Sequence, residues 1–589
     1  VFGASGGTQT YNGGLTTTSV GSTVTLNGSI VTSNDALTFG AVTLGSATTI
    51  DTNASSTTGD LTLGVVTGGS NTLTLSTGDN VANSDITASG NISGVTTLTL
   101  SDVGGTATFA GDVDVTTLSV DNTVANVALN GDGSSVTNAV SFANDGTLQL
   151  GDASGDTLTF NGGLTTTSVG STVTLNGTIN ASDDAITLGA VTLGSNTTVD
   201  TNAASSNTAD LTIAAVTGGS NTLTLSTENN VANADITASG AISGVTTLTL
   251  ASVGGTATLS ADVDVTTLSV DNTVANVAFT GNGSSVTNSF TPANDGTFVF
   301  GASGGTQTYN GGLTTTSVGS TVTLNGTIAS SNDAIVLGAV TLGSATTIDT
   351  NASSNAGDIT VAAITGGSNN LTLSTGDNVS GADITASGAI SGLGNLTLAD
   401  VGGTATFSAN VAAAALSADS TVANISFTGG SNTFSAASTL ANDGTLTFGD
   451  ATGDSFTFNG GLTTSSVGST VTLNTSISSS DDALTFGAIT LGNNVTIDTN
   501  STTTNRADIA IGAVTGGSNT LTLTTENNVT GADITASGAI SGVTTLTLAS
   551  VGGTATLSAD VDVTTLSVDN TVANVAFTGN GSSVTNSFT

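Results

Sequence analysis

The stretch GGLTTTSVGSTVTLNG, residues 13–28, decides the fold because the chain repeats it. It returns unchanged at 162–177 and 311–326, and it returns as GGLTTSSVGSTVTLNT at 460–475. The leucine of this stretch stands at positions 15, 164, 313 and 462, so three successive spacings are each 149 residues. A fixed period of this kind indicates a repeat architecture.

A second motif, DITASG, shows that the repeats are paired. Its isoleucine stands at 86, 236, 384 and 534, which gives spacings of 150, 148 and 150 residues. Two repeats therefore form a super-repeat of 298 residues, and at that distance residues 532–589 are identical to 234–291. The alternating single-residue differences are typical of insertions at loops.

The period divides the chain into five segments, which we expect to form one continuous solenoid. We also expect the chain to belong to a longer array of the same repeats. The predicted segments are the end of a preceding repeat (1–12), repeat 1 (13–161), repeat 2 (162–310), repeat 3 (311–459) and an incomplete repeat 4 (460–589).

Each repeat has the pattern of short β-strands. In TLTL (72–75) and TLTF (157–160), apolar and hydroxyl residues alternate, which places them on opposite faces of a strand. Threonine, valine and phenylalanine favour strands. Gly, Asn and Asp gather between these runs, as in GGSN and ANDG, and such residues favour tight turns. Helix signals are nearly absent, so the sequence predicts an all-β protein.

Shorter echoes within a repeat predict how the strands stack. VTTLTL (95–100) is echoed by VTTLSV (115–120), and FGAVTLGS (39–46) is echoed by LGVVTGGS (63–70). Such offsets correspond to coils of roughly 20 to 25 residues, which are typical of a parallel β-helix, in which stacked coils bury one continuous core. The sequence thus predicts a parallel β-solenoid with about seven coils in each repeat.

Composition excludes several classes of function. The chain has no His and no Cys, so it has no Ser-His-Asp triad, cysteine nucleophile, disulfide or zinc site of the usual kind. Its formal net charge is −41, with one Lys or Arg among 589 residues. Nucleic-acid binding needs cations, so we expect no nucleic-acid partner. No run of 18 apolar residues occurs, so we expect no membrane-spanning segment.

Phrases such as ITASGAISGVTTLTL and GGTATFAGDVDVTTLSV give the whole chain a resemblance to a known class of proteins. The chain resembles large bacterial surface proteins with β-strand repeats, related in style to filamentous-haemagglutinin-like and autotransporter parallel β-helices. The resemblance implies an exported protein that acts as a fibre, an adhesin or a surface coat. Phage tail fibres have a similar style of sequence.

Calcium is the one cofactor that the sequence suggests. In GDASGD and GDATGD two acids flank small residues, and these acids are Asp152 with Asp156 and Asp450 with Asp454. Carboxylates in a glycine-containing turn suit calcium, which prefers oxygen ligands. The alternative is that these carboxylates are solvated turn residues, because the corresponding turns at 3–7 and 301–305 lack both acids.

Other polar residues favour no catalytic site. Asp112 with Asp114, or Asp183 with Asp184, would supply the two carboxylates of a glycosidase. These motifs recur with the repeat, whereas a catalytic site is usually unique, so we expect no enzyme activity. The single cation, Arg506, replaces a threonine of repeat 2, and we interpret it as a loop substitution. Asn27, in an Asn-x-Ser/Thr motif, is a candidate for glycosylation.

The sequence therefore predicts a structural protein of the extracellular space or cell surface. We expect a long solenoid that self-associates into a filament or a surface layer, by end-to-end or lateral packing. The alternative is the stalk of an adhesin or a phage-type tail fibre, which spaces a receptor-binding tip from its base.

Overall fold

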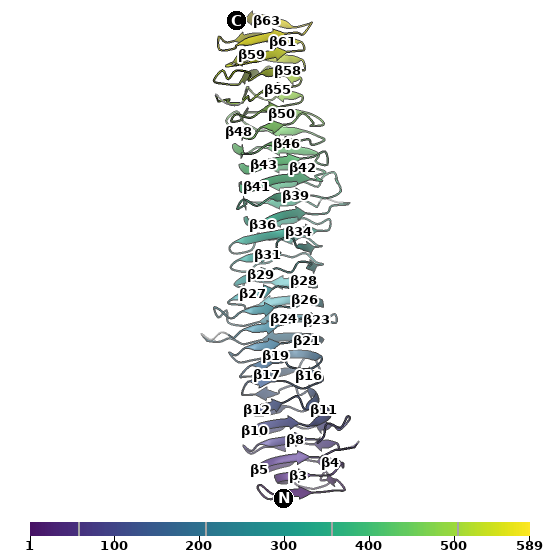
Figure 1. Cartoon of the computed structure of the whole chain (residues 1–589). Helices are drawn as coiled ribbons and strands as arrows, with labels where there is room; N and C mark the ends of the chain where they lie inside the picture. Colours follow the sequence, from purple (N-terminus) through teal and green to yellow (C-terminus); the bar gives the residue numbers. More distant parts are fainter. Residues whose placement is uncertain (57–58, 206–208, 355–356, 503–505) are drawn as a thin grey trace. The chain divides into compact units, whose positions relative to one another are not determined.

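The computed structural model describes residues 1–56, 59–205, 209–354, 357–502 and 506–589. In these ranges every element is a β-strand, and neighbouring strands pair in parallel, as in Leu15 with Leu37. The expected all-β parallel solenoid is therefore confirmed (Figure 1). The chain forms two compact units, which we describe separately: the first contains Val1–Thr287 and Pro292–Phe298, and the second contains Asn288–Thr291 and Val299–Thr589.

The first unit contains thirty strands in its described residues. They are β1 (Thr8–Thr10), β2 (Leu15–Thr16), β3 (Val24–Val31), β4 (Leu37–Phe39), β5 (Val42–Asp51), β6 (Leu61–Leu63), β7 (Val66–Thr67), β8 (Leu73–Ser76), β9 (Ile86–Ala88), β10 (Ile92–Ser101), β11 (Val103–Phe109), β12 (Val113–Val120), β13 (Val124–Leu129), β14 (Ser135–Val136), β15 (Val140–Ser141), β16 (Leu148–Leu150), β17 (Thr157–Phe160), β18 (Leu164–Thr165), β19 (Val173–Asn180), β20 (Ile186–Leu188), β21 (Val191–Asp200), β22 (Leu211–Ile213), β23 (Val216–Thr217), β24 (Thr222–Ser226), β25 (Ile236–Ala238), β26 (Ile242–Ala251), β27 (Thr256–Leu259), β28 (Val263–Val270), β29 (Asn276–Phe279) and β30 (Ser285–Val286).

The remaining strands begin at the end of the first unit or lie in the second. They are β31 (Phe298–Phe300), β32 (Thr306–Tyr309), β33 (Leu313–Thr314), β34 (Val322–Ser330), β35 (Ile335–Leu337), β36 (Val340–Asp349), β37 (Ile359–Val361), β38 (Ile364–Thr365), β39 (Leu371–Ser374), β40 (Ile384–Ala386), β41 (Ile390–Ala399), β42 (Thr404–Phe407), β43 (Val411–Ala418), β44 (Asn424–Phe427), β45 (Ser431–Phe434), β46 (Ser438–Leu440), β47 (Leu446–Phe448), β48 (Ser455–Phe458), β49 (Leu462–Thr463), β50 (Val471–Leu473), β51 (Ser476–Ser478), β52 (Leu484–Thr485), β53 (Ile489–Leu491), β54 (Val495–Asp498), β55 (Ile509–Ile511), β56 (Val514–Thr515), β57 (Thr520–Thr524), β58 (Ile534–Ala536), β59 (Ile540–Ala549), β60 (Thr554–Leu557), β61 (Val561–Val568), β62 (Asn574–Phe577) and β63 (Ser583–Phe588).

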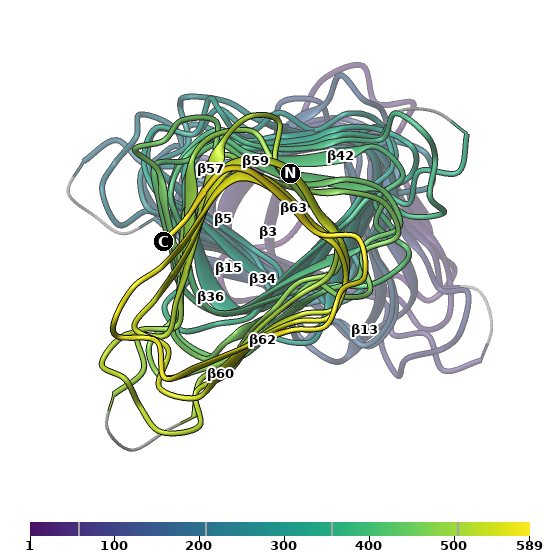
Figure 2. The same cartoon turned by 90° about the horizontal axis from the view of Figure 1, so that it is seen from above.

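The coils are three-sided, as the view along the stack shows (Figure 2). In the first unit each side is a column of paired strands, and we name the three columns after Leu15, Val24 and Ile30. Leu15 pairs with Leu37 of the next coil, Val24 pairs with Val42, and Ile30 pairs with Ile50. Side chains that point inward from the three columns form one core.

Long strands such as β3 serve two columns because they bend. The register of β3 against β5 shifts between Leu26 and Gly28, which is a β-bulge. Gly28 has φ 66°, and a Cβ atom there would lie 2.2 Å from the carbonyl oxygen of Gly7. Only glycine fits this corner without strain.

The two echoes noted in the sequence are confirmed as stacked coils. Val95 pairs with Val115, and Val42 pairs with Val66, as the repeated phrases predict. Coil length varies more widely than the echoes suggest. The coil from Val173 to Val191 is shorter than either echo, whereas the coil from Val66 to Ile92 is longer than both.

The repeat does not contain a whole number of coils. The Leu15 column runs through seven pairings to Val173, which is the repeat-2 counterpart of Val24 and not of Leu15; its members in order are Leu15, Leu37, Leu61, Ile86, Ala107, Val127, Leu148 and Val173. The seven coils from Leu15 to Val173 thus take 158 residues, which is nine more than the 149-residue period. Nine residues are also the length of one side of the coil, from Leu15 to Val24. A repeat spans about six and two-thirds coils, close to the predicted value of about seven.

The Ile30 column and the second unit show the same shift. The Ile30 column continues from Val120 to Phe142 and, through the pair of Val140 with Leu164, reaches the counterpart of Leu15. In the second unit, the column that begins at Leu313 likewise reaches Val471, the counterpart of Val322; its final pairing joins Leu446 to Val471. Corresponding residues of successive repeats within one unit therefore lie on different sides of the coil.

The core is built from the alternation that the sequence predicts. Strand β3 alternates buried and half-buried residues along its whole length. The second unit adds aromatic stacks, since the Phe427 ring lies parallel to the rings of Phe407 and Phe448, with centroids 4.8 and 6.0 Å away. All three phenylalanines are fully buried. Each such side chain stabilises the stack by about 1.5–3 kcal/mol through burial.

Candidate functional site

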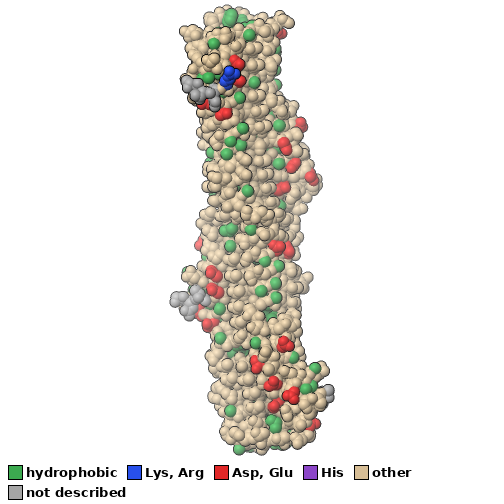
Figure 3. All heavy atoms as spheres, in the orientation of Figure 1, with side chains coloured by type: hydrophobic (Ala, Val, Ile, Leu, Met, Phe, Trp, Pro, Cys, Tyr) green, Lys and Arg blue, Asp and Glu red, His purple; other side chains and the backbone are tan. Residues whose placement is uncertain are grey.

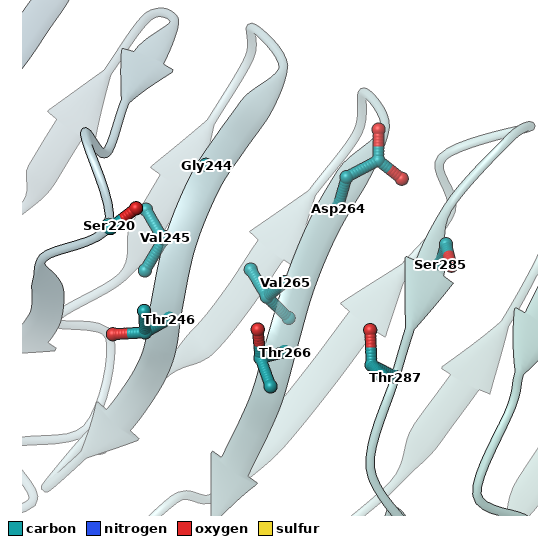
Figure 4. A pocket seen from close by; sticks show the side chains of 9 residues that line it. All are labelled: Ser220, Gly244, Val245, Thr246, Asp264, Val265, Thr266, Ser285 and Thr287. Atoms are coloured by element: carbon teal, nitrogen blue, oxygen red, sulfur yellow. The ribbon is translucent and has the colours of Figure 1, made fainter.

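A groove at a bend of the coil is the clearest candidate site, and it occurs in repeats 1, 2 and 4. In repeat 2 it has a volume of about 290 Å³ and lies across β26, β28 and β30 (Figure 4). The corresponding grooves of repeats 1 and 4 have volumes of about 420 and 310 Å³. Repeat 2 lines the groove with Ser220, Gly244, Val245, Thr246, Asp264, Val265, Thr266, Ser285 and Thr287.

The backbone makes the groove by bending at a bulge. The register of β26 against β28 shifts between Ser243 and Val245, and Gly244 between them has φ 67°. The preceding coil follows this bend, since the Ser220 N–H donates to the carbonyl oxygen of Gly244 at 2.8 Å. The concave surface is therefore a fixed feature of the coil.

A row of threonines lines one side of the groove. Thr246 and Thr266 lie on adjacent strands, Thr287 follows β30, and Figure 4 shows the three side chains in line. Neighbouring strands lie about 4.8 Å apart, which sets the spacing of these hydroxyl groups. The Thr246 hydroxyl donates to the carbonyl oxygen of Asn221 at 3.1 Å, which fixes its orientation.

Asp264 and Ser285 lie beyond Val265 from this row (Figure 4). Val265 points inward and is only 4% exposed, whereas Asp264 precedes it on β28, points outward and is exposed. Partial loss of solvation raises the pKa of Asp264, the charge of Asp262 raises it further, and the backbone N–H of Ser285 opposes both effects. Burial raises the pKa of Asp114 in repeat 1 in the same way, again with a contribution from its neighbour, Asp112.

The two grooves of the first unit lie on different sides of the coil. Asp114 follows Val113, which pairs with Ile92 in the Val24 column. Asp264 follows Val263, which pairs with Ile242 in the Leu15 column. This difference follows from the fractional number of coils in a repeat.

Repeat 3 keeps the backbone of this corner and lacks three of the groove's six polar side chains. The Ser368 N–H donates to the carbonyl oxygen of Gly392 at 2.6 Å, as its counterpart does in repeat 2. Gly394, Ala412 and Ala414 occupy the positions of Thr246, Asp264 and Thr266. The sequence did not lead us to predict this site. A usable signal was present, because three repeats have VDVTT where repeat 3 has VAAAA (411–415).

The acids proposed for calcium form a closed turn. Oδ2 of Asp156 accepts the N–H groups of Asp152 at 2.6 Å and Ala153 at 2.8 Å. Oδ2 of Asp454 accepts the N–H groups of Asp450 at 2.9 Å and Ala451 at 3.0 Å. One acid of each pair thus holds the turn, and calcium at these turns stays a prediction.

Burial raises the pKa of Asp152, and the charge of Asp156 raises it further. In the described part of the chain, no group of three or more acidic side chains is arranged to hold a metal ion. A calcium ion at this turn would therefore need backbone carbonyls and water for most of its ligands.

Other acids bind the backbone of neighbouring coils. Oδ1 of Asp60 accepts the N–H of Asp85 at 3.1 Å, and Oδ1 of Asp85 accepts the N–H of Thr106 at 2.7 Å. Oδ1 of Asp112 accepts the N–H of Gly133 at 2.9 Å. These carboxylates join one coil to the next.

Asp183 also has a structural role. Its Oδ1 accepts the N–H of Ala204 at 3.0 Å, and its carboxylate accepts the hydroxyl of Ser205. The hydroxyl of Ser205 is the main cause that lowers the pKa of Asp183. Asp112 and Asp183 were considered as catalytic acids from the sequence. In the structure both bind residues of a neighbouring coil.

The surface carries few charges, as Figure 3 shows for one face. Acidic side chains are scattered over this face, and Arg506 is exposed beside Gly531. Among the residues that the structure describes, no helix has the length and apolar character needed to span a membrane. A scan against protein-family models and searches of curated proteins and of solved structures found no match to this chain.

Proposed function

We propose that the chain is a structural protein of the extracellular space, whose solenoid forms part of a filament or surface layer. The observation that supports this proposal is the unbroken parallel pairing within each unit. In the first unit the Leu15 column continues from coil to coil as far as Val263. A continuous hydrogen-bonded stack resists local opening, because each coil is held by the coils on both sides.

The surface chemistry fits this role. Outward positions of the strands carry threonine and serine, as in Thr74 paired with Thr99 and Thr99 paired with Ser119. The net charge of −41 makes neighbouring molecules repel one another, and physiological salt screens this repulsion beyond about 8 Å, so contacts between uncharged faces remain possible. We propose self-association as the means by which the solenoid becomes a larger assembly, with no catalytic activity.

The stalk of an adhesin or of a phage-type fibre is the second candidate. The described coils bury their core within one chain, since Leu37, Leu61 and Ile86 of successive coils are all fully buried. An intertwined trimeric fibre would need apolar side chains shared among three chains. The buried single-chain core therefore favours a solenoid stalk over an intertwined fibre.

Cryo-electron microscopy of the native assembly tests both candidates. We expect solenoids that continue end to end or pack side by side, with the three-sided coil visible in cross-section. A distinct globular domain at one end of isolated, unassociated molecules would favour the stalk. Three chains wound around one core would overturn both forms of the proposal.

A further inference from the structure

We propose that the grooves centred on Asp114, Asp264 and Asp562 are binding sites for neutral glycans. This inference goes beyond the structural role and does not depend on how the solenoid assembles. The first argument is the lining. Each groove offers one carboxylate and several Ser and Thr hydroxyls above two nearly buried valines, as in Asp264 with Val245 and Val265.

This lining matches the chemistry of a sugar. A carboxylate accepts two hydrogen bonds at once, so it can bind two neighbouring sugar hydroxyls, while Ser and Thr both donate and accept. The threonine row, spaced at about 4.8 Å by the strands, provides further partners along the ring or along a chain of rings. Volumes of about 290–420 Å³ lie near the lower end of the range for small-ligand sites.

Charge argues for a neutral ligand. The groove contains a carboxylate, and the chain has a net charge of −41, so both repel acidic sugars. Asp264 is exposed, so its carboxylate is accessible to a ligand. A cationic ligand would be favoured by a cluster of acids, whereas each groove is lined by a single acid and mostly by hydroxyls.

Repeat 3 shows that the acid is not required by the fold. Its corner keeps the same pairing, since Ile390 pairs with Val411 as Ile242 pairs with Val263. Alanine nevertheless replaces the acid there, at Ala412. The pairing at this corner therefore does not depend on the carboxylate, which can contact a ligand in the other three repeats.

The test uses the full chain on an array of neutral and acidic oligosaccharides, followed by calorimetric titration with the neutral glycan that binds best. The D114A/D264A/D562A variant gives every groove the alanine found in repeat 3. We expect three sites per chain in the native protein and roughly 10- to 100-fold weaker binding in the variant. The D79A/D132A/D377A variant removes three exposed acids outside the grooves and should bind as the native chain does.

Two further measurements keep the result decisive. Circular dichroism should show the same strand content and melting temperature for both triple variants, because repeat 3 already tolerates alanine. The A412D/A414T variant should add a site in repeat 3 and raise the stoichiometry from three towards four, whereas a side chain at Gly394 would clash with the carbonyl oxygen of Ser368. Absence of neutral-glycan binding, equal binding by the D114A/D264A/D562A variant, or binding only to an amine polymer such as polylysine would overturn the proposal.

Discussion

Leu148 pairs with Val173, so the column that begins at Leu15 passes into the counterpart of Val24. The true counterpart of Leu15 is Leu164, which pairs instead with Val140 in the Ile30 column. Each repeat is therefore turned by one side of the coil relative to the preceding repeat in its unit. The two grooves of the first unit, at Asp114 and Asp264, therefore face different directions.

Disulfide trapping tests this rotation directly, because the chain has no cysteine of its own. Gln149 pairs with Thr174, and Ser141 pairs with Thr165. Adjacent parallel strands place paired Cα atoms about 4.8 Å apart, within the range that a disulfide spans. We expect oxidation to cross-link Q149C/T174C and S141C/T165C, measured by mass spectrometry. The Q149C/T165C variant joins different columns and should stay reduced; the opposite pattern would show that the repeats are stacked without rotation.

The sequence could predict the parallel solenoid and two of its stacking offsets, because Val95 and Val115 lie in nearly identical phrases. It could not predict the three sides of the coil. The corners are made by different local devices, such as the bulge at Gly28, and neighbouring coils differ in length. Because the coils differ in length, the 149-residue period does not reveal that a repeat contains a non-integer number of coils. The groove was missed for a related reason, since its lining comes from several successive coils.

Substitution of Phe427 by alanine tests the aromatic core. Its ring is fully buried and stacks on Phe407 and Phe448. A cavity of this size typically costs about 3–5 kcal/mol of the free energy of unfolding. Phe577 occupies the corresponding position in repeat 4 and is 39% exposed, so F577A is a matched control with an expected smaller loss. Urea denaturation followed by circular dichroism compares the two variants, and equal losses would contradict the assigned core.

A half-buried acid in repeat 4, Asp498, predicts a specific dependence on pH. Burial raises the pKa of Asp498 to about 6, the backbone N–H of Asn500 opposes this shift, and Glu526 adds to it. An unfolded aspartate has a pKa of about 3.9, so the folded state holds this proton more tightly. Its contribution to stability is present below about pH 4 and is lost as the pH rises through about 6.

The D498N variant stays neutral and should not lose this contribution. We expect its melting temperature, relative to the native chain, to rise between pH 4 and pH 6 and then to remain constant. The E526Q variant should show part of the same gain because it removes the neighbouring charge. D132N, at an exposed site, should follow the native curve. A constant difference between D498N and the native chain across this range would contradict the shift.

Variants of the turn at Asp152 and Asp156 distinguish a structural role of these acids from calcium binding. Oδ2 of Asp156 already accepts two backbone N–H groups, so we expect the turn to remain closed without metal. D156A should lower the free energy of unfolding by about 1–3 kcal/mol, because it leaves donors without an acceptor. D152A should change it by less than about 0.5 kcal/mol, as is usual for exposed sites. Differential scanning calorimetry with EDTA or with millimolar calcium completes the test: calcium that raises the native melting temperature, but not that of D152A, would establish a metal site in place of a closed turn.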